Sequence, residues 1–175
     1  MSASTTPERK RTFSWDDPLI GARVAATMSG LEFLQAIERG ELPAPPIMLA
    51  LNIGFQEAEA GRVVFSVEPA EYHYNPIGVV HGGLASTLCD SAMGCAIQST
   101  LPAGVGYTTL ELKVNFVRAL TVATGLVLCE GKVINVGGRV GTAEARVTDR
   151  AGKLYAHATT TCLIMRPAAE TERSR

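Results

Sequence analysis

The chain has 175 residues, with 16 lysines and arginines against 17 aspartates and glutamates, and a formal net charge of −1. This length fits one domain with short tails, and the charge balance argues against a nucleic-acid-binding module or a polybasic membrane anchor. Hydrophobic residues make up 46% of the chain and charged residues 19%, which excludes wholesale disorder, and no uninterrupted apolar run approaches the roughly 18 residues that a membrane span needs.

The N-terminal segment is polar and predicts a tail. It holds a short basic run at Arg9, Lys10 and Arg11 but no apolar stretch of the kind found in a secretory signal. The four cysteines have no CxxC spacing and lie in apolar runs, as is typical of reduced core residues. We therefore expect residues 1–28 to be the partly disordered tail of a cytoplasmic protein.

A short amphipathic helix is predicted at residues 29–42. Ser29 can cap its N-terminus, its apolar residues fall on one face, and a glycine ends it. The prolines that follow favour an extended connection. Two strands are then predicted, at residues 48–57 and 62–68, with a turn at Gly61 between them.

The chain changes character at residues 82–101, where apolar residues at helical spacing cover most of the helix circumference. A helix of this kind is buried. Apart from its cysteines it contains one acid or base, Asp90, and a carboxylate in an apolar helix is unfavourable unless it has a partner or a role. A general base and a structural, hydrogen-bonded aspartate both remain compatible with this pattern.

Four further strands are predicted after this helix, and most connections are of hairpin length. The strands lie at residues 109–116, 121–136, 139–148 and 153–165. This order predicts an α+β fold in which one long helix packs on a largely antiparallel sheet, with the last four strands as a meander. An open sheet leaves edges that can pair with another chain, so we expect a homodimer.

The residues just before the long helix can form an anion site. His81 precedes Gly82 and Gly83, which let a substrate approach the backbone closely. The first amides of a helix have no internal partner and can hold an oxyanion. The side-chain amide of Asn75 can donate to the same oxygen, although taken alone these residues are more often a plain glycine-rich helix entry and a turn asparagine.

The spacing of these groups adds a constraint. Gly82 and Asp90 are eight residues apart on one predicted helix, or roughly 12 Å of rise. A base and an oxyanion donor must both lie within about 3 Å of neighbouring reacting atoms. Either the two residues do not cooperate, or a dimer places Gly82 of one chain beside Asp90 of the other.

The sequence does not match other known catalytic or metal-binding motifs. There is no GxSxG nucleophile elbow, and residues 125–132 do not match the spacing of a phosphate loop. The histidines and cysteines have no zinc spacing. We therefore expect no metal and no organic cofactor.

The stretch from Asn75 to Gly83, followed by Leu88-Cys89-Asp90, resembles the hotdog-fold acyl-CoA thioesterases of the PaaI (phenylacetate-degradation) type. The resemblance covers roughly residues 45–166, and residues 108–118 resemble the family's strand after the helix. It implies a hotdog fold, a long central helix wrapped by an antiparallel sheet. The implied domain is 29–166 with its core at 45–166, the extra N-terminal helix outside that core, and a C-terminal tail at 167–175.

The resemblance also implies roles for single residues. The Gly82 amide polarises the thioester carbonyl with help from Asn75, and Asp90 of the partner chain is the general base or nucleophile. Thr109 positions the water, and His81 orients the loop.

Further residues are implied in substrate binding. Gly83 allows close approach of the substrate, and Thr108 is the alternative to its neighbour as the water-positioning residue. Arg118 and Arg139 are implied to meet the phosphates of CoA.

The expected function is therefore hydrolysis of an acyl- or aryl-CoA thioester to free acid and CoA at a dimer-interface site. The expected partners are the acyl-CoA substrate and a second copy of the chain, with dimers pairing again into tetramers, and neither nucleic acid nor membrane. The alternative is a non-catalytic hotdog protein that binds acyl-CoA as a sensor or accessory. The joint presence of Asn75, Gly82 and Asp90 favours the enzyme, and no second acid or histidine is placed for a dehydratase.

Overall fold

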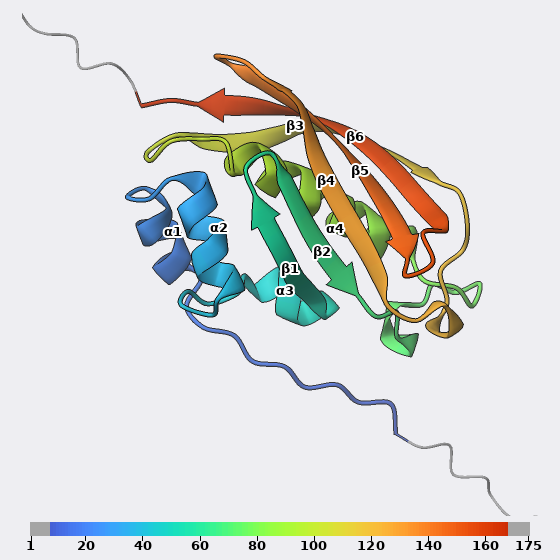
Figure 1. The fold of residues 1–175 in the computed structure, drawn as a ribbon. Helices are drawn as coiled ribbons and strands as arrows, with labels where there is room; N and C mark the ends of the chain where they lie inside the picture. The colour runs from blue at the N-terminus through green and yellow to red at the C-terminus, as the bar shows by residue number, and fades with distance from the viewer. Residues whose placement is uncertain (1–7, 168–175) are drawn as a thin grey trace, which may run out of the picture.

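Six antiparallel strands form one sheet that wraps around helix α4 (Gly82–Gln98) in the computed structural model, which describes residues 8–167 (Figure 1). The strand order is β1-β2-β4-β5-β6-β3. The strands are β1 (Ile53–Glu59), β2 (Arg62–Val67), β3 (Gly106–Phe116), β4 (Val127–Val136), β5 (Val140–Asp149) and β6 (Leu154–Met165). The other helices are α1 (Leu19–Ala25), α2 (Gly30–Glu38) and α3 (Pro46–Leu51), with 3-10 turns η1 (Glu71–His73) and η2 (Val122–Thr124).

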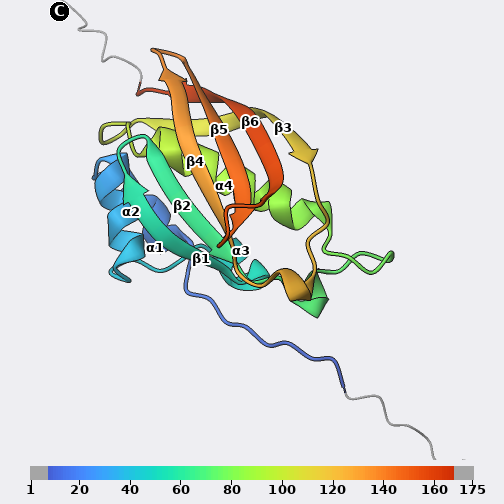
Figure 2. The same cartoon turned by 45° about the vertical axis from the view of Figure 1, so that its right-hand side comes forward.

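Helix α4 is the centre of the core, as the apolar residues over most of its circumference predict. Leu88 is 1% exposed, and Met93 and Ile97 are fully buried. The helix lies so close to β4 that a Cβ atom at Gly131 would overlap the carbonyl oxygen of Ala92. Figure 2 shows the sheet curving around α4, with β3 along one edge and β1 along the other.

The predicted four-strand meander is wrong in one respect. β4, β5 and β6 are joined by hairpins and pair in sequence, but β3 pairs with β6, and β4 pairs with β2. The segment between β3 and β4, residues 117–126, contains η2 and is too long for a hairpin, so it carries the chain past β6 and β5 to the edge of β2. For the same reason β4 starts at Val127, later than the strand predicted from residue 121.

The predicted start of the second helix is confirmed, whereas two other expectations before β1 are wrong. Ser29 caps α2 with a reciprocal bond to Glu32. The strand predicted from residue 48 starts as helix α3, because Pro46 supports the first turn of a helix and Asn52 ends it with a left-handed backbone (φ 55°). Helix α1 lies inside the segment predicted as a tail.

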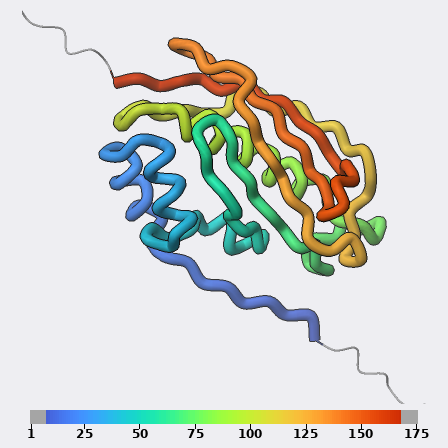
Figure 3. The backbone as a smooth tube through the Cα atoms, viewed as in Figure 1, coloured from blue at the N-terminus to red at the C-terminus, as the bar shows by residue number. Residues whose placement is uncertain are grey.

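The chain before α1 runs as an extended segment along the body, as the tube in Figure 3 shows. The predicted solvated basic run makes contacts: Arg9 pairs with Glu71 (2.6 Å). Arg11 donates to the carbonyl oxygen of Leu49 (2.6 Å) and its guanidinium lies over the Tyr72 ring, 4.3 Å from the centroid. The rest of the two predicted tails, residues 1–7 and 168–175, lies outside the described residues.

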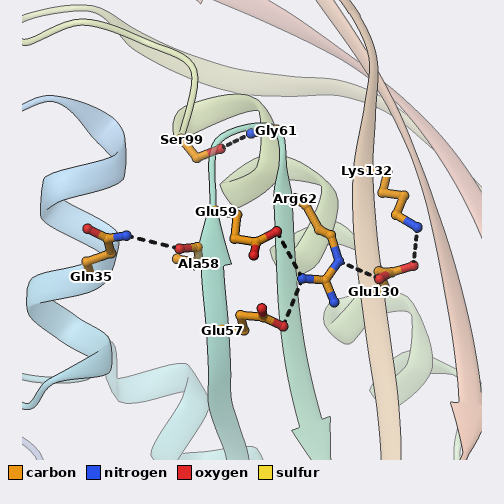
Figure 4. Close-up of polar contacts among 9 residues, drawn as sticks. All are labelled: Gln35, Glu57, Ala58, Glu59, Gly61, Arg62, Ser99, Glu130 and Lys132. Carbon is orange, nitrogen blue, oxygen red and sulfur yellow. Dashed lines mark hydrogen bonds and ion pairs between the residues drawn. The ribbon is translucent and has the colours of Figure 1, made fainter.

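Polar contacts fasten the β1–β2 hairpin on both sides (Figure 4). Gln35 on α2 donates to the carbonyl oxygen of Ala58 (3.1 Å), which covers the β1 edge. At the hairpin turn the N–H of Gly61 donates to Ser99 (2.8 Å) just after α4. On the sheet surface the Arg62 guanidinium bonds Glu130 on β4 (2.6 Å).

The edge formed by β3 has no such cover among residues 8–167. Leu110 is 61% exposed and Phe116 58%, on a strand of 11 residues that pairs with β6 along one side only. Long apolar edges of this kind invite pairing with another chain. Among the helices of the described chain, none is long and apolar enough to cross a membrane.

The contact between α4 and β4 yields a first prediction. Gly131→Ala is expected to lower the free energy of unfolding by at least about 2 kcal/mol, because the added methyl group must push the helix off the strand. Urea unfolding of the variant measures this loss. Gly138→Ala is the matched control: its Cβ would meet no atom within 4 Å, so a change within about 0.5 kcal/mol is expected. Equal stability of the two variants would contradict the close packing.

Candidate active site

The N-terminus of α4 presents one unpaired amide. His81 caps the helix: its Nδ1 accepts from the N–H of Gly83 (2.8 Å), and its carbonyl oxygen accepts from the N–H of Leu84 (3.0 Å). Within residues 8–167 the N–H of Gly82 has no acceptor. The amide of Gly82 is therefore available to an oxygen atom of a ligand, whereas the amide of Gly83 is engaged by the cap.

Gly83 has a separate structural role. A Cβ atom there would lie 2.8 Å from Nδ1 of His81, so a larger residue would displace the capping ring. The family resemblance implies substrate binding for Gly83 and orientation of the loop for His81. The geometry shows how each supports the position of Gly82.

Asn75 organises the loop that leads to α4. Its Oδ1 accepts from the backbone N–H groups of Ile77 (3.1 Å) and Val79 (3.3 Å), and its own N–H donates to the Val79 carbonyl (2.8 Å). With the oxygen held by the loop, the amide nitrogen is the end that remains for a ligand. The turn role and the donor role of Asn75 are thus compatible.

His73 holds the same loop, a role that the sequence analysis misses. The buried ring accepts from the Ala70 N–H at Nδ1 (3.0 Å) and donates from Nε2 to the Leu51 carbonyl (3.0 Å). Its own carbonyl accepts from the N–H of His81 (2.8 Å). Burial lowers the pKa of His73. No local pattern reveals this role, because Leu51 lies 22 residues away.

Asp90 is hydrogen-bonded to Thr109. The hydroxyl of Thr109 on β3 donates to Oδ1 of Asp90 (2.9 Å). Side chains alternate along a strand, so Thr108 faces the other side of the sheet. The structure therefore brings together Asp90 and Thr109, the first choice of the sequence analysis for the water-positioning residue.

Neutral groups surround Asp90 on its buried side. Burial raises the pKa of Cys95 to about 12 and also raises that of Cys162, so both thiols are protonated at neutral pH. Burial raises the pKa of Tyr107 well above its usual value. A thiolate nucleophile is therefore not available beside Asp90.

The two ends of β3 hold different functional groups. Arg118, just after β3, lines a pocket of about 390 Å³ beside Gly82 and donates to the Leu154 carbonyl (2.5 Å). Arg139 lies at the opposite end of the sheet, where its carbonyl accepts from the N–H of Ile164 (2.9 Å). One protomer thus does not bring the two arginines together.

Gly82 and Asp90 are also apart within one protomer. Both belong to α4, eight residues from each other, which is roughly 12 Å of rise. No group of three or more histidine, cysteine or acidic side chains that can hold a metal occurs in residues 8–167.

Comparison with known proteins identifies the family. Residues 77–156 match the model of the thioesterase superfamily. A candidate esterase of Saccharolobus solfataricus is 30% identical over 139 residues, which cover 79% of this chain and 97% of that protein. A candidate esterase of Halobacterium salinarum is 34% identical over 102 residues, 55% of this chain and 66% of that protein. The chain belongs to the thioesterase superfamily, which confirms the predicted class, a thioester hydrolase.

Solved structures confirm the hotdog fold and the resemblance to the PaaI type. A phenylacetic acid degradation-related protein of Ralstonia eutropha, described as a candidate thioesterase, superposes with a TM-score of 0.67 at 26% identity, over 74% of this chain and 98% of that one. A Streptococcus mutans protein solved with acetyl-CoA bound superposes with a TM-score of 0.60 at 27% identity, over 66% of this chain and 92% of that one.

The contacts of His73 predict a pH dependence of stability. Since its pKa is lower in the folded protein than its ordinary value of 6.5, the unfolded chain binds the proton more readily. Stability is then expected to fall as the pH drops below about 6.5, by up to about 1.4 kcal/mol per pH unit for one proton. Urea unfolding between pH 8 and pH 5 measures this slope.

His73→Gln should be less stable at pH 8 and should show a shallower slope. His157→Gln, at an exposed position of β6, should keep the wild-type slope. If both variants and the wild type lose stability in parallel, His73 is not the group that titrates.

Proposed function

We propose that the protein hydrolyses an acyl- or aryl-CoA thioester to free acid and CoA at a site that two protomers of a homodimer share. One observation carries this proposal. The unpaired amide of Gly82 lies near the end of β3, whereas the Asp90–Thr109 pair lies near its start, and the outer edge of β3 has no partner strand among the described residues.

Pairing of two β3 edges would bring these groups together. Gly82 lies against Phe116, the last residue of β3, since a Cβ atom on Gly82 would be 3.0 Å from that ring. Thr109 lies near the start of the strand. In a two-fold antiparallel pair the start of one strand faces the end of the other. Asp90 of the partner subunit then approaches Gly82, and Arg139 of the partner subunit approaches the end of the site where Arg118 lies.

The proposed reaction follows from these positions. The thioester carbonyl oxygen accepts from the N–H of Gly82 and from the side-chain nitrogen of Asn75. Asp90 takes a proton from water, whose oxygen attacks the carbonyl carbon and forms a tetrahedral oxyanion. The C–S bond then breaks, and the sulfur of CoA leaves with the proton that Asp90 returns. Direct attack by the Asp90 carboxylate is the other route to the same products.

Thr109 has two tasks in this scheme. Its hydroxyl hydrogen holds Oδ1 of Asp90, which leaves Oδ2 for the proton of the water. Its oxygen can accept a hydrogen bond from the same water. The aligned peptides of α4 add partial positive charge at Gly82, where the oxyanion forms.

Substitution of Asp90 tests the base. Asp90→Asn is expected to reduce kcat by about 10²–10⁴-fold with little change in stability. Hydrolysis of a panel of aryl-, short- and medium-chain acyl-CoA thioesters, followed by thiol release, measures the first effect, and thermal unfolding the second. Glu144→Gln, an exposed acid on β5, is the control and should retain wild-type turnover. A destabilised Asp90→Asn variant with normal turnover would assign Asp90 a structural role.

The alternative, a protein that binds acyl-CoA without hydrolysing it, predicts a different result in the same assay. The wild type would bind acyl-CoA but release no thiol.

Mixing two inactive variants tests the shared site. Asn75→Ala removes an oxyanion donor, and Asp90→Asn removes the base, so each variant alone should be nearly inactive. After co-refolding in equal amounts, about half of the dimers are mixed, and each mixed dimer has one intact site of two. Roughly a quarter of wild-type turnover should return. If turnover stays at the mean of the two parents, each site takes all its groups from one chain.

A further inference from the structure

The chain before α1 contacts the segment that leads to the proposed oxyanion donor. We call residues 9–15 of this chain the strap. The strap lies outside residues 77–156, which match the thioesterase model. Its contacts fall on two neighbouring features, the C-terminal end of α3 and the 3-10 turn η1. Since η1 contains His73, the strap lies against the part of the fold that holds the loop from Asn75 to His81.

Arg11 attaches the strap to α3. Its guanidinium donates to the carbonyl oxygens of Leu49 (2.6 Å) and Ala50 in the last turn of that helix. The final carbonyl groups of a helix lack partners within the helix, and a cation is favoured beside them. A planar guanidinium has donors on several nitrogens in a fixed geometry, so it can bond two such oxygens at once.

Arg11 also contacts η1. Its guanidinium lies over the ring of Tyr72, 4.3 Å from the centroid, and 5.5 Å from the ring centroid of Phe13 within the strap. The ion pair of Arg9 with Glu71 (2.6 Å) contributes little, because these side chains are 63% and 62% exposed and water screens their attraction. Arg11 is therefore the main link between the strap, α3 and η1.

His73 joins the same two features from the inside. Its ring packs edge-on against Tyr72, with centroids 4.2 Å apart, and its Nε2 donates to the carbonyl of Leu51, the last residue of α3 (3.0 Å). Burial lowers the pKa of His73, and the positive charge of Arg11 adds to this effect, which favours the neutral ring that these contacts need. The buried imidazole and the exposed guanidinium thus hold η1 against α3 from opposite sides.

Backbone contacts connect this assembly to the amide of Gly82. The carbonyl of His73 accepts from the N–H of His81 (2.8 Å), and Nδ1 of His81 caps α4 by accepting from the N–H of Gly83 (2.8 Å). A shift of η1 therefore moves His81 and, with it, the first turn of α4. A group that stabilises a transition state must be held within about 0.5 Å of its best position, so a small shift is enough to weaken it.

We propose that the strap positions the oxyanion donor of the proposed site, and that Arg11 is a positioning residue that acts through η1 and His73. The inference rests on the proposed function and adds a residue to the same site. It predicts that loss of Arg11 changes how the protein holds a carbonyl oxygen, beyond any change in stability.

Turnover is the first test. Arg11→Ala is expected to lower kcat about tenfold or more with a smaller change in KM, because the hydrogen bond from Gly82 is strongest to the oxyanion of the transition state. Arg11→Lys keeps the charge but not the planar pair of donors, so it should give an intermediate kcat. Arg23→Ala is the matched control: Arg23 is an exposed arginine on α1 that pairs with Asp17 (3.5 Å), and its loss should leave kcat unchanged. Thermal unfolding fixes an assay temperature at which all variants are folded.

Two CoA derivatives that cannot be hydrolysed give a readout independent of turnover. In a ketone analogue a methylene group replaces the thioester sulfur and the carbonyl remains, whereas an S-alkyl-CoA thioether of the same length has no carbonyl. The wild type should bind the ketone more tightly, since only the ketone accepts from the amide of Gly82. Arg11→Ala should reduce this preference about threefold or more and leave the dissociation constant of the thioether unchanged, whereas Arg23→Ala should keep both values.

Two results would overturn the inference. An unchanged ketone preference in Arg11→Ala would leave the strap a purely structural role, even if the variant is less stable. Equal weakening of both ligands would place Arg11 in the binding of CoA instead. If Arg11→Ala does not fold, the same comparison is made with Arg11→Lys.

The ligand pair also separates this inference from the proposed function. If the wild type hydrolyses no thioester but its ketone preference depends on Arg11, the proposed function fails and the role of the strap stands. If the wild type hydrolyses thioesters, and neither kcat nor the ketone preference changes in Arg11→Ala, the role of the strap fails and the proposed function stands. A wild type that does not prefer the ketone overturns both, because no carbonyl then meets the amide of Gly82.

Discussion

Helix α4 is apolar and buried over most of its circumference, and the rest of the fold is arranged around this constraint. Leu88 and Ile97 lie on different sides of the helix, and both are buried. A sheet that covers such a helix must curve around it, and β4 approaches it so closely that only a glycine fits at position 131. The helix therefore cannot bend to shorten the distance between Gly82 and Asp90, because bending would disrupt the packing of the core.

Local patterns predict much of this architecture, and the parts they miss depend on distant partners. The buried helix and the Ser29 cap follow from periodicity and residue type over a few positions. The pairing of β3 with β6 does not, because a strand carries no local mark of which neighbour it will bond. The strand prediction at residue 48 fails for a related reason: the apolar residues of α3 fit either structure, and Pro46 decides for the helix.

The candidate site shows the same contrast between features that local sequence predicts and features that depend on distant residues. The loop from Asn75 to His81 and the residue Asp90 are recognisable in the sequence because their spacing resembles a family pattern. The choice between Thr108 and Thr109 requires knowing which face of β3 packs against α4, and it is the face that carries Thr109. The engagement of the Gly83 amide by His81 and the role of His73 depend on ring orientation, which no spacing reveals.

The β-bulge of β3 has a consequence for how two chains can meet. The register with β6 shifts between Thr109 and Glu111, so the strand carries one extra residue, Leu110, directly after the residue that bonds Asp90. A regular strand can slide along a partner edge in steps and find several pairings of similar energy. A bulged strand breaks this degeneracy, since its hydrogen-bonding groups no longer repeat evenly. The irregularity at Leu110 therefore disfavours slipped, aggregation-prone pairings of the exposed edge.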